Sequence, residues 1–130
     1  MESAQRTHLS LLVHLARVDD HFAVVEEDMI RNIANDYGLP TEDVNELIDQ
    51  PDAIEDLDAI TKDLDLKFRS IYDCIQLMVI DGIVDQKEIT FCNMVADKLG
   101  YSRDLVQYLT DHRHDSSDQV RRSAYEMGII

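Results

Sequence analysis

The chain has 130 residues, the length of one ordinary domain, and its 27 acidic and 12 basic side chains give a formal charge of −15. A field of that sign repels phosphate backbones and anionic lipid, which argues against nucleic-acid binding and against direct docking on a membrane surface. The same charge suits cations or a basic protein partner, although it also serves simple solubility.

The spacing of apolar residues predicts helices over almost the whole chain. In order they cover about residues 4–18, 24–37, a short helix opened by Pro40 and Thr41, a short helix at 53–60, 66–79, 86–98, a short helix around 105–109, and 117–127. Gly38 and Gly100 stand where helix C-caps belong, and Thr41 is the expected N-cap of the third helix. No alternation typical of strands occurs, so we expect an all-α protein.

Residues 50–66 are acidic and interrupted by Pro51, and we interpret them as a connector within one domain. Each flank alone is too short to bury a good core, which argues against two domains. Near the other end of the chain, Ser116 or Ser117 is expected to cap the last helix. The closing tripeptide GII is expected to tuck against the core or to fray.

Two cysteines, Cys74 and Cys92, occur at neither a CxxC nor a zinc-finger spacing, and both are expected to be small buried hydrophobes. No apolar run follows the opening MESAQRTH, and no stretch approaches the roughly 18 apolar residues of a membrane span. We therefore expect a cytoplasmic protein without direct membrane insertion, which a partner would have to bring to any membrane.

A shift of 62 positions aligns the two halves of the chain without a gap, pairing Asp19 with Asp81, Glu26 with Glu88, Gly38 with Gly100 and Leu47 with Leu109. Each unit, at about 12–49 and 74–111, consists of a helix, an acidic junction, a helix, a glycine and a short helix. Two units are fewer than a solenoid needs, so we expect them to pack about a pseudo-twofold axis in one closed bundle over residues 1–130. The helix at 117–127 lies outside the repeat.

The second junction carries a resemblance to a known family. An apolar helix that ends in LMVIDGIVDQKE, followed by ADKLGY, resembles the TerB-like family of tellurite-resistance proteins and the TerB-like N-terminal domain of a membrane-anchored DnaJ-type co-chaperone. The resemblance covers about residues 12–109. Asp81, Gly82 and Glu88 match the family's Asp-Gly after an apolar helix and its Glu early in the next helix. In the first copy Asp20 replaces the glycine.

That resemblance implies an all-α bundle of about seven to eight helices built from two related halves. It also implies a role in metal and chemical stress responses, within complexes that include membrane-associated proteins. The clustered acidic residues of the family have been proposed to bind divalent cations, and the resemblance implies no enzymatic activity for this domain.

Six acidic residues at the junctions are the candidate metal ligands: Asp19, Asp20 and Glu26 in the first, and Asp81, Asp85 and Glu88 in the second. Mg²⁺ needs only one or two carboxylates and Ca²⁺ takes six to eight oxygens, so we favour these ions over Zn²⁺. If the two junctions meet, four carboxylates converge, and they repel one another unless a cation or protons intervene. The spacing is not that of an EF-hand loop.

Helix capping is the alternative explanation for the same residues. Asp85 stands at an N-cap position with Glu88 three residues later, as in a capping box. Asp81 is able to accept backbone N–H groups in the turn, and Gly82 would supply an unusual φ. The first copy fits this account only in part, because Ala23 occupies the position of Asp85 and has no capping oxygen.

Histidines offer weaker metal sites. His112 and His114, in the segment DHRHDSSD, are a candidate transition-metal pair, and His21 is a candidate zinc ligand beside the first acidic cluster. A solvated loop and a surface ion pair are the plainer interpretations of these residues. No Ser, His and Asp arrangement stands in a recognisable context and no glycine-rich phosphate loop occurs, so we expect no enzyme.

Two functions remain open at this point. The first is a non-enzymatic scaffold domain that binds protein partners, with a cation stabilising its acidic face. The second is a metal-binding or metal-sensing protein in which the carboxylates are the function. Partner binding that is independent of metal would favour the first. A large cation-induced gain in stability, lost in Asp81→Asn, would favour the second. The sequence leaves the oligomeric state open.

Overall fold

The computed structural model describes residues 3–54 and 57–130, and within them the chain forms eight helices and no β-strand. The helices are α1 (Ser3–Arg17), α2 (Val24–Asp36), α3 (Thr41–Asp49), α4 (Asp58–Thr61), α5 (Leu64–Val79), α6 (Gln86–Leu99), α7 (Arg103–Asp111) and α8 (Ser117–Glu126). The expected all-α class and the expected number of helices are therefore confirmed.

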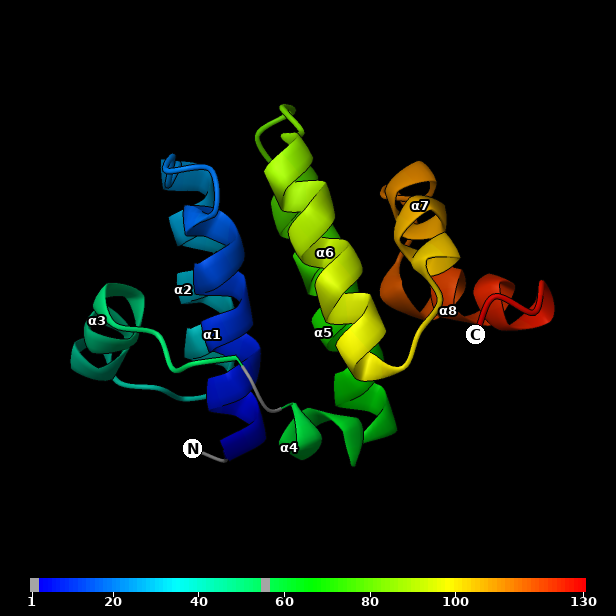
Figure 1. The fold of residues 1–130 in the computed structure, drawn as a ribbon. Coiled ribbons are helices and arrows are strands. Elements are labelled where there is room, and N and C mark those ends of the chain that lie inside the picture. The colour runs from blue at the N-terminus through cyan, green and yellow to red at the C-terminus, as the bar shows by residue number, and fades with distance from the viewer. Residues whose placement is uncertain (1–2, 55–56) are drawn as a thin grey trace.

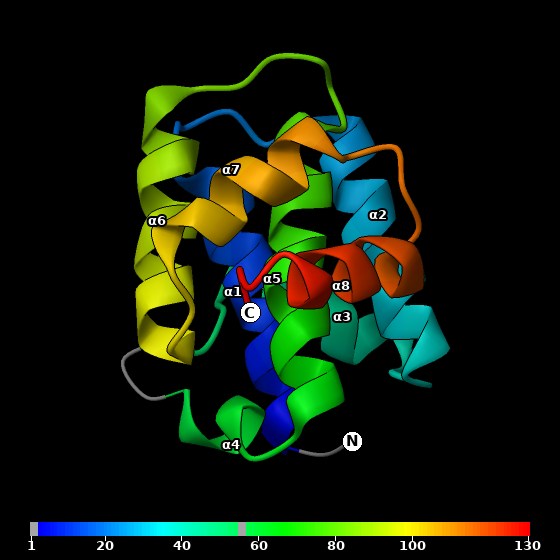
Figure 2. The ribbon, with the colours of Figure 1, turned by 90° about the vertical axis from the view of Figure 1, so that its right-hand side faces the viewer.

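Helices α1 and α5 form the centre of the bundle and run in the same direction (Figure 1). α2 and α3 pack on α1, while α6 packs on α5 and α7 packs on both α5 and α6. α4 lies across the lower ends of α1 and α5, and α8 packs on α5 and α7 (Figure 2). Because the two central helices are parallel, the junctions that follow them lie at the same end of the molecule, at the top of both figures.

Helix boundaries repeat with the offset of 62 positions that the sequence shows. α1 and α5 end at Arg17 and Val79, α2 and α6 begin at Val24 and Gln86, and α3 and α7 cover Thr41–Asp49 and Arg103–Asp111. The bundle thus consists of two related three-helix units, and α4 and α8 are the additional helices. The expected construction from two related halves is confirmed.

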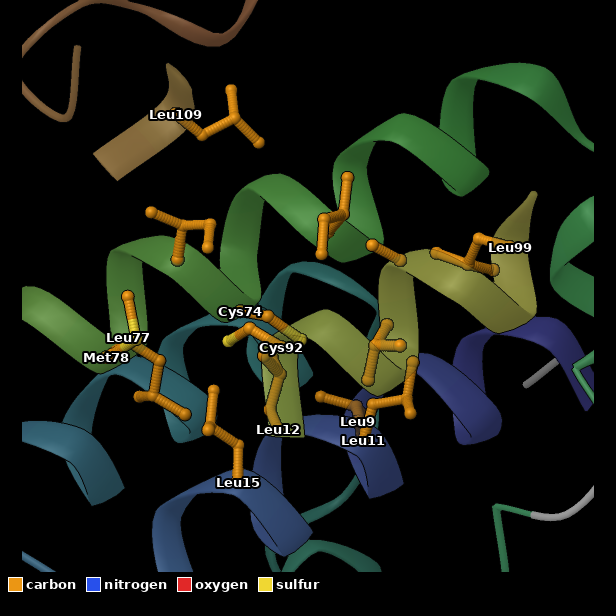
Figure 3. Packing of buried hydrophobic residues seen from close by; sticks show 14 of the residues in the cluster. Leu9, Leu11, Leu12, Leu15, Cys74, Leu77, Met78, Cys92, Leu99 and Leu109 are labelled. Atoms are coloured by element: carbon orange, nitrogen blue, oxygen red, sulfur yellow. The ribbon is translucent and has the colours of Figure 1, made fainter. Parts of the chain in front are cut away.

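The core lies where the leucines of α1 meet α5 and α6 (Figure 3). Leu9, Leu12 and Leu15 are completely buried there. Cys74 on α5 and Cys92 on α6 are free thiols in the same core, and burial raises the pKa of both, that of Cys92 to about 12. Neither thiol forms the reactive thiolate at neutral pH, so both act as the small hydrophobes that the sequence predicts.

Thr41 is not the N-cap of α3, contrary to the prediction. Pro40 holds that position, with φ −60° and ψ 148°, and its carbonyl accepts the backbone N–H groups of Asp43 and Val44. Thr41 is the first residue inside the helix. The proline ring fixes the φ angle that the turn into the helix requires, so no capping hydroxyl is needed to start it.

The short helix predicted at 53–60 is wrong over its first residues, and residues 55–56 lie outside the described part of the chain. Residues 51–54 are not helical, and α4 begins at Asp58. The backbone N–H of Asp52 donates to Ser10 Oγ at 3.1 Å, and its carbonyl lies 2.9 Å from Nε2 of His14. Bonds to α1 thus occupy the groups that a helix would use internally.

The C-terminal elements agree with expectation. Ser116 caps α8 by accepting the backbone N–H of Gln119 at 3.2 Å. Ile129 and Ile130 are partly buried against the core, so the closing residues tuck in. Among the residues that the structure describes, no helix combines the length and the apolar character needed to cross a bilayer.

Candidate functional site

The two acidic junctions have the same turn geometry. Asp19 Oδ1 accepts the backbone N–H of His21 at 3.0 Å, and Asp81 Oδ1 accepts that of Ile83 at 3.0 Å. The intervening residues, Asp20 and Gly82, both have positive φ, 62° and 78°. Aspartate tolerates the left-handed region better than most side chains do, so Asp20 can replace the glycine without changing the turn.

Glu26 and Glu88 hold equivalent places in the first turns of α2 and α6. Each carboxylate turns back and accepts a backbone N–H three residues earlier, from Ala23 at 3.0 Å and from Asp85 at 3.2 Å. Asp85 in turn caps α6 through the N–H of Lys87 at 2.7 Å, whereas Ala23 has no oxygen for that bond. The capping interpretation is confirmed for the second copy, and for the glutamate alone in the first.

Both glutamates are buried, with 3% of Glu26 and 4% of Glu88 exposed, which is rare for carboxylates. Burial is the main cause that raises the pKa of Glu88 to about 7. The hydrogen bond from the backbone N–H of Asp85 lowers this pKa, and the negative charges of Asp19, Glu26 and Asp81 raise it. Burial likewise raises the pKa of Glu26, to which Asp81 and Asp19 add. The junctions therefore form one electrostatic unit of four carboxylates.

The other two predicted ligands, Asp20 and Asp85, are not among the groups that raise these pKa values. Asp20 is exposed, and Asp85 is engaged in capping. Across residues 3–54 and 57–130, no three His, Cys, Asp or Glu side chains gather closely enough to hold a metal ion. The described carboxylates therefore form no preformed set of three or more metal ligands.

The predicted histidine sites are not assembled either. His112 Nδ1 lies 2.9 Å from the carbonyl of Tyr108, and its ring stacks on that tyrosine with centroids 4.1 Å apart. His114 is exposed at the surface. His21 is exposed too, and its backbone N–H, not its ring, bonds to Asp19.

Exposed apolar side chains surround the junctions and form what we call the junction patch: Val24 (76% exposed), Val25 (44%), Ile80 (43%), Ile83 (71%) and Val84 (42%). Single exposed hydrophobes are ordinary on protein surfaces, but a group of five at one end is not. The patch occupies the start of α2 and the α5–α6 loop, at the end of the molecule where the two junctions lie. This end of the molecule therefore combines an exposed apolar surface with neighbouring acidic side chains.

A buried polar network between α1, α2 and α5 is the feature that sequence reasoning missed. Nδ1 of His8 lies 2.5 Å from the hydroxyl of Tyr37, and Nε2 lies 2.9 Å from Oδ2 of Asp73. The second contact lacks the alignment of a hydrogen bond, so it is electrostatic in character. Arg69 Nε donates to Asp73 Oδ1 at 2.9 Å. Asp73 stands between apolar residues on both sides in sequence, a pattern that signals a carboxylate with a buried partner.

This network lines a cavity of about 590 Å³. The order of tyrosine, histidine and aspartate resembles that of a nucleophile, its base and an orienting group. Burial, followed by the charge of Asp73, raises the pKa of Tyr37 to about 12, so its phenol stays protonated. That favours Tyr37 as a hydrogen-bond donor that fixes His8 over a role as a nucleophile.

A protein-family model matches most of the chain. The family described as "Tellurite resistance protein TerB" matches residues 5–111, which run from α1 to the end of α7 and leave α8 outside. No curated protein and no solved structure matches the chain. The match agrees with the resemblance that the second junction shows in sequence.

Proposed function

We propose, from the premise that this chain belongs to the TerB family of tellurite resistance proteins, that it is a non-enzymatic, stress-related scaffold domain of the cytoplasm. A protein partner docks on the junction patch, beside a divalent-cation site that the two acidic junctions provide together. One observation carries this proposal: the patch and the two buried glutamates share the same end of the bundle.

Charge selects the kind of partner. The patch presents valines and isoleucines among the carboxylates of Asp19, Asp81 and Asp85, on a chain of formal charge −15. A partner segment with apolar side chains flanked by Lys or Arg complements both features, because opposite potentials steer encounter and fix register. Nucleic acid and anionic lipid have the wrong sign.

The raised pKa values support the cation. Burial raises the pKa of Glu88 to about 7, so this carboxyl is about half protonated near neutral pH, and repulsion from Asp19, Glu26 and Asp81 adds to the shift. A divalent ion would relieve that repulsion. Mg²⁺ suits the site best, because it keeps several waters and needs only one or two carboxylates, and water can span the distances that the side chains leave. Ca²⁺ is the second choice, and Zn²⁺ the third.

Binding of a designed probe tests the docking surface. A fluorescent amphipathic peptide with basic flanks should bind the EDTA-treated protein, and a peptide of reversed charge should not. Ile83→Ser should weaken binding at least tenfold, while Met127→Ser, which removes an equally exposed apolar side chain elsewhere, should leave binding unchanged. Equal binding of both peptides, or equal effects of both substitutions, would contradict the proposal.

Thermal unfolding tests the cation and separates the two candidate functions. The melting temperature of EDTA-stripped protein is measured with and without about millimolar Mg²⁺, Ca²⁺, Mn²⁺ or Zn²⁺. A cation present at 100 times its Kd should stabilise the folded protein by roughly 2.7 kcal/mol. The gain should vanish in Asp81→Asn and persist in Asp104→Asn, which removes an aspartate charge from the first turn of α7, outside the junctions. If the peptide binds only when the cation is present, metal sensing is the primary function. If it binds without the cation, docking is primary.

A further inference from the structure

The large hydrophobic side chains that are exposed in the described residues fall into two groups. Five belong to the junction patch. The other three are Leu64 at the start of α5, Tyr125 near the end of α8, and Met127 just after it, exposed by 67%, 73% and 65%. The second group lies on α5 and α8, on a different side of the bundle from the junctions (Figures 1 and 2).

A groove of about 420 Å³ accompanies the second group, and we call it the tail groove. Its apolar wall consists of Leu64, Tyr101, Tyr125 and Ile130, its basic residues are Lys67, Arg121 and Arg122, and its acidic residue is Asp118. On a chain with 27 acidic and 12 basic side chains, an excess of basic residues around a groove is a local reversal of charge.

The basic groups of the groove stand in place on rigid helices. Lys67 Nζ lies 4.5 Å from the centroid of the Tyr101 ring, and Arg121 NH1 donates to Asp65 Oδ1 at 2.7 Å. Arg122 is exposed on α8, one residue further on. Asp65 offsets the charge of Arg121, so Lys67 and Arg122 supply the positive charge that the groove presents beside its apolar surface.

The α5–α6 loop has the complementary chemistry. Ile83 and Val84 project apolar side chains into solvent, and Asp81 and Asp85 flank them on either side. An apolar pair between two carboxylates matches a groove of apolar walls and basic rims. One molecule cannot join its own two surfaces, because they lie on different sides of a bundle whose helices pack on one core.

We propose that the tail groove receives the α5–α6 loop of a second copy of this chain, in a head-to-tail contact. The inference rests on the proposed function in that it uses the junction patch as a docking surface and names a second copy as one partner. Such a contact is heterologous, so a pair of molecules still has one free groove and one free loop between them, and the assembly grows into rings or chains. A single loop in a groove buries little area, so the contact is weak.

Sedimentation velocity over about 10 μM to about 1 mM tests the contact, since small interfaces populate in that range. The weight-average mass of the full chain should rise with concentration. The rise should be smaller in about 1 M salt, because charges separated by more than roughly 3 Å are then screened from one another. Ile83→Ser removes an apolar contact of the α5–α6 loop, and Arg122→Glu reverses a charge in the tail groove. Each variant alone should therefore remain a monomer. Arg113→Glu, an exposed arginine outside the groove, should assemble as the parent does.

A mixture of the two variants gives the decisive result. The intact groove of Ile83→Ser should accept the intact loop of Arg122→Glu, giving a heterodimer that stops at two chains. A mixture that stays monomeric, a parent chain that stays monomeric at every concentration, or assembly by either variant alone would overturn the head-to-tail contact. Binding of the basic peptide by a monomeric parent would show that the docking function stands while this inference fails.

Discussion

His8 and Asp73 face each other between the two central helices, with Nε2 and Oδ2 2.9 Å apart and both side chains almost completely buried. Arg69 completes the arrangement from the solvent side, where half of its side chain is exposed. A buried carboxylate with two basic neighbours is balanced, but it becomes costly as soon as one partner is lost.

Asp73→Ala should therefore destabilise the protein by about 3 kcal/mol, because it removes the acceptor of Arg69 and the carboxylate that faces the buried ring of His8. Urea unfolding monitored by circular dichroism measures the change. Asp97→Ala is the matched control, since Asp97 pairs with Arg103 at 3.0 Å on the surface, where such pairs contribute at most about 1 kcal/mol. Equal losses in the two variants would mean that burial of Asp73 does not govern its contribution.

Stability should fall as pH rises from about 4.5 towards about 7. The folded-state pKa of Glu88 is about 7, above its ordinary value of 4.5, so in this window the folded protein binds a proton that the unfolded chain has released. The protonated Glu88 makes its full contribution to the free energy of unfolding below about pH 4.5, and this contribution is lost as the pH rises through about 7. Glu26, whose pKa is also raised, acts in the same direction.

Glu88→Gln removes this dependence, so the difference in unfolding free energy between parent and variant should change with pH over that window. We expect a change on the order of 1 kcal/mol, because water still screens a carboxylate near the surface. Unfolding in urea at several pH values measures it. A pH-independent difference would show that Glu88 ionises normally in the folded state.

Gly82 and Asp20 should respond oppositely to substitution. Gly82→Ala should cost about 1 kcal/mol, because a Cβ at φ 78° is strained although no atom lies within 4 Å of its place. Asp20→Gly should be neutral or slightly stabilising, because glycine adopts the same backbone without strain. Paired denaturation curves measure both effects, and a large loss in Asp20→Gly would reveal a contact of the Asp20 carboxylate.

Ala23→Ser should stabilise α2 by about 0.5–1 kcal/mol by supplying the cap that the first junction lacks. Ala23 already has the extended conformation of an N-cap, with φ −71° and ψ 152°. Asp85→Ala, which removes the cap of α6, should cost about 1 kcal/mol. Thermal unfolding compares the two variants. If Ala23→Ser changes nothing, the return bond from Glu26 already satisfies the first turn of α2.

Much of the fold can be predicted because local sequence patterns, such as the spacing of apolar residues, determine where the helices form. Apolar spacing locates the helices, and the offset of 62 positions between Asp19 and Asp81 relates the two halves. The pattern puts the N-cap of α3 at Thr41 instead of Pro40, because proline geometry can replace a side-chain cap. The segment before α4 departs from the predicted helix because bonds to Ser10 and His14, distant in sequence, decide its conformation.

The candidate site was predictable only in its parts. The repeat indicated that Glu26 and Glu88 are equivalent, and capping explained their bonds. Sequence alone could not show that both carboxylates are buried or that the two junctions share a field, since both facts depend on α1 and α5 being parallel. The pairing of His8 with Asp73 lies outside the repeat and arises from tertiary packing alone.

The parallel course of α1 and α5 also means that the two copies of the repeat cannot vary independently. Antiparallel copies would have placed their loops at opposite ends, each free to change by itself. Here Asp81 of the second copy raises the pKa of Glu26 in the first, and Asp19 of the first raises that of Glu88 in the second. The effect of a charge substitution in one half therefore depends on the residue that the other half presents, which makes the junctions a single epistatic unit within one chain.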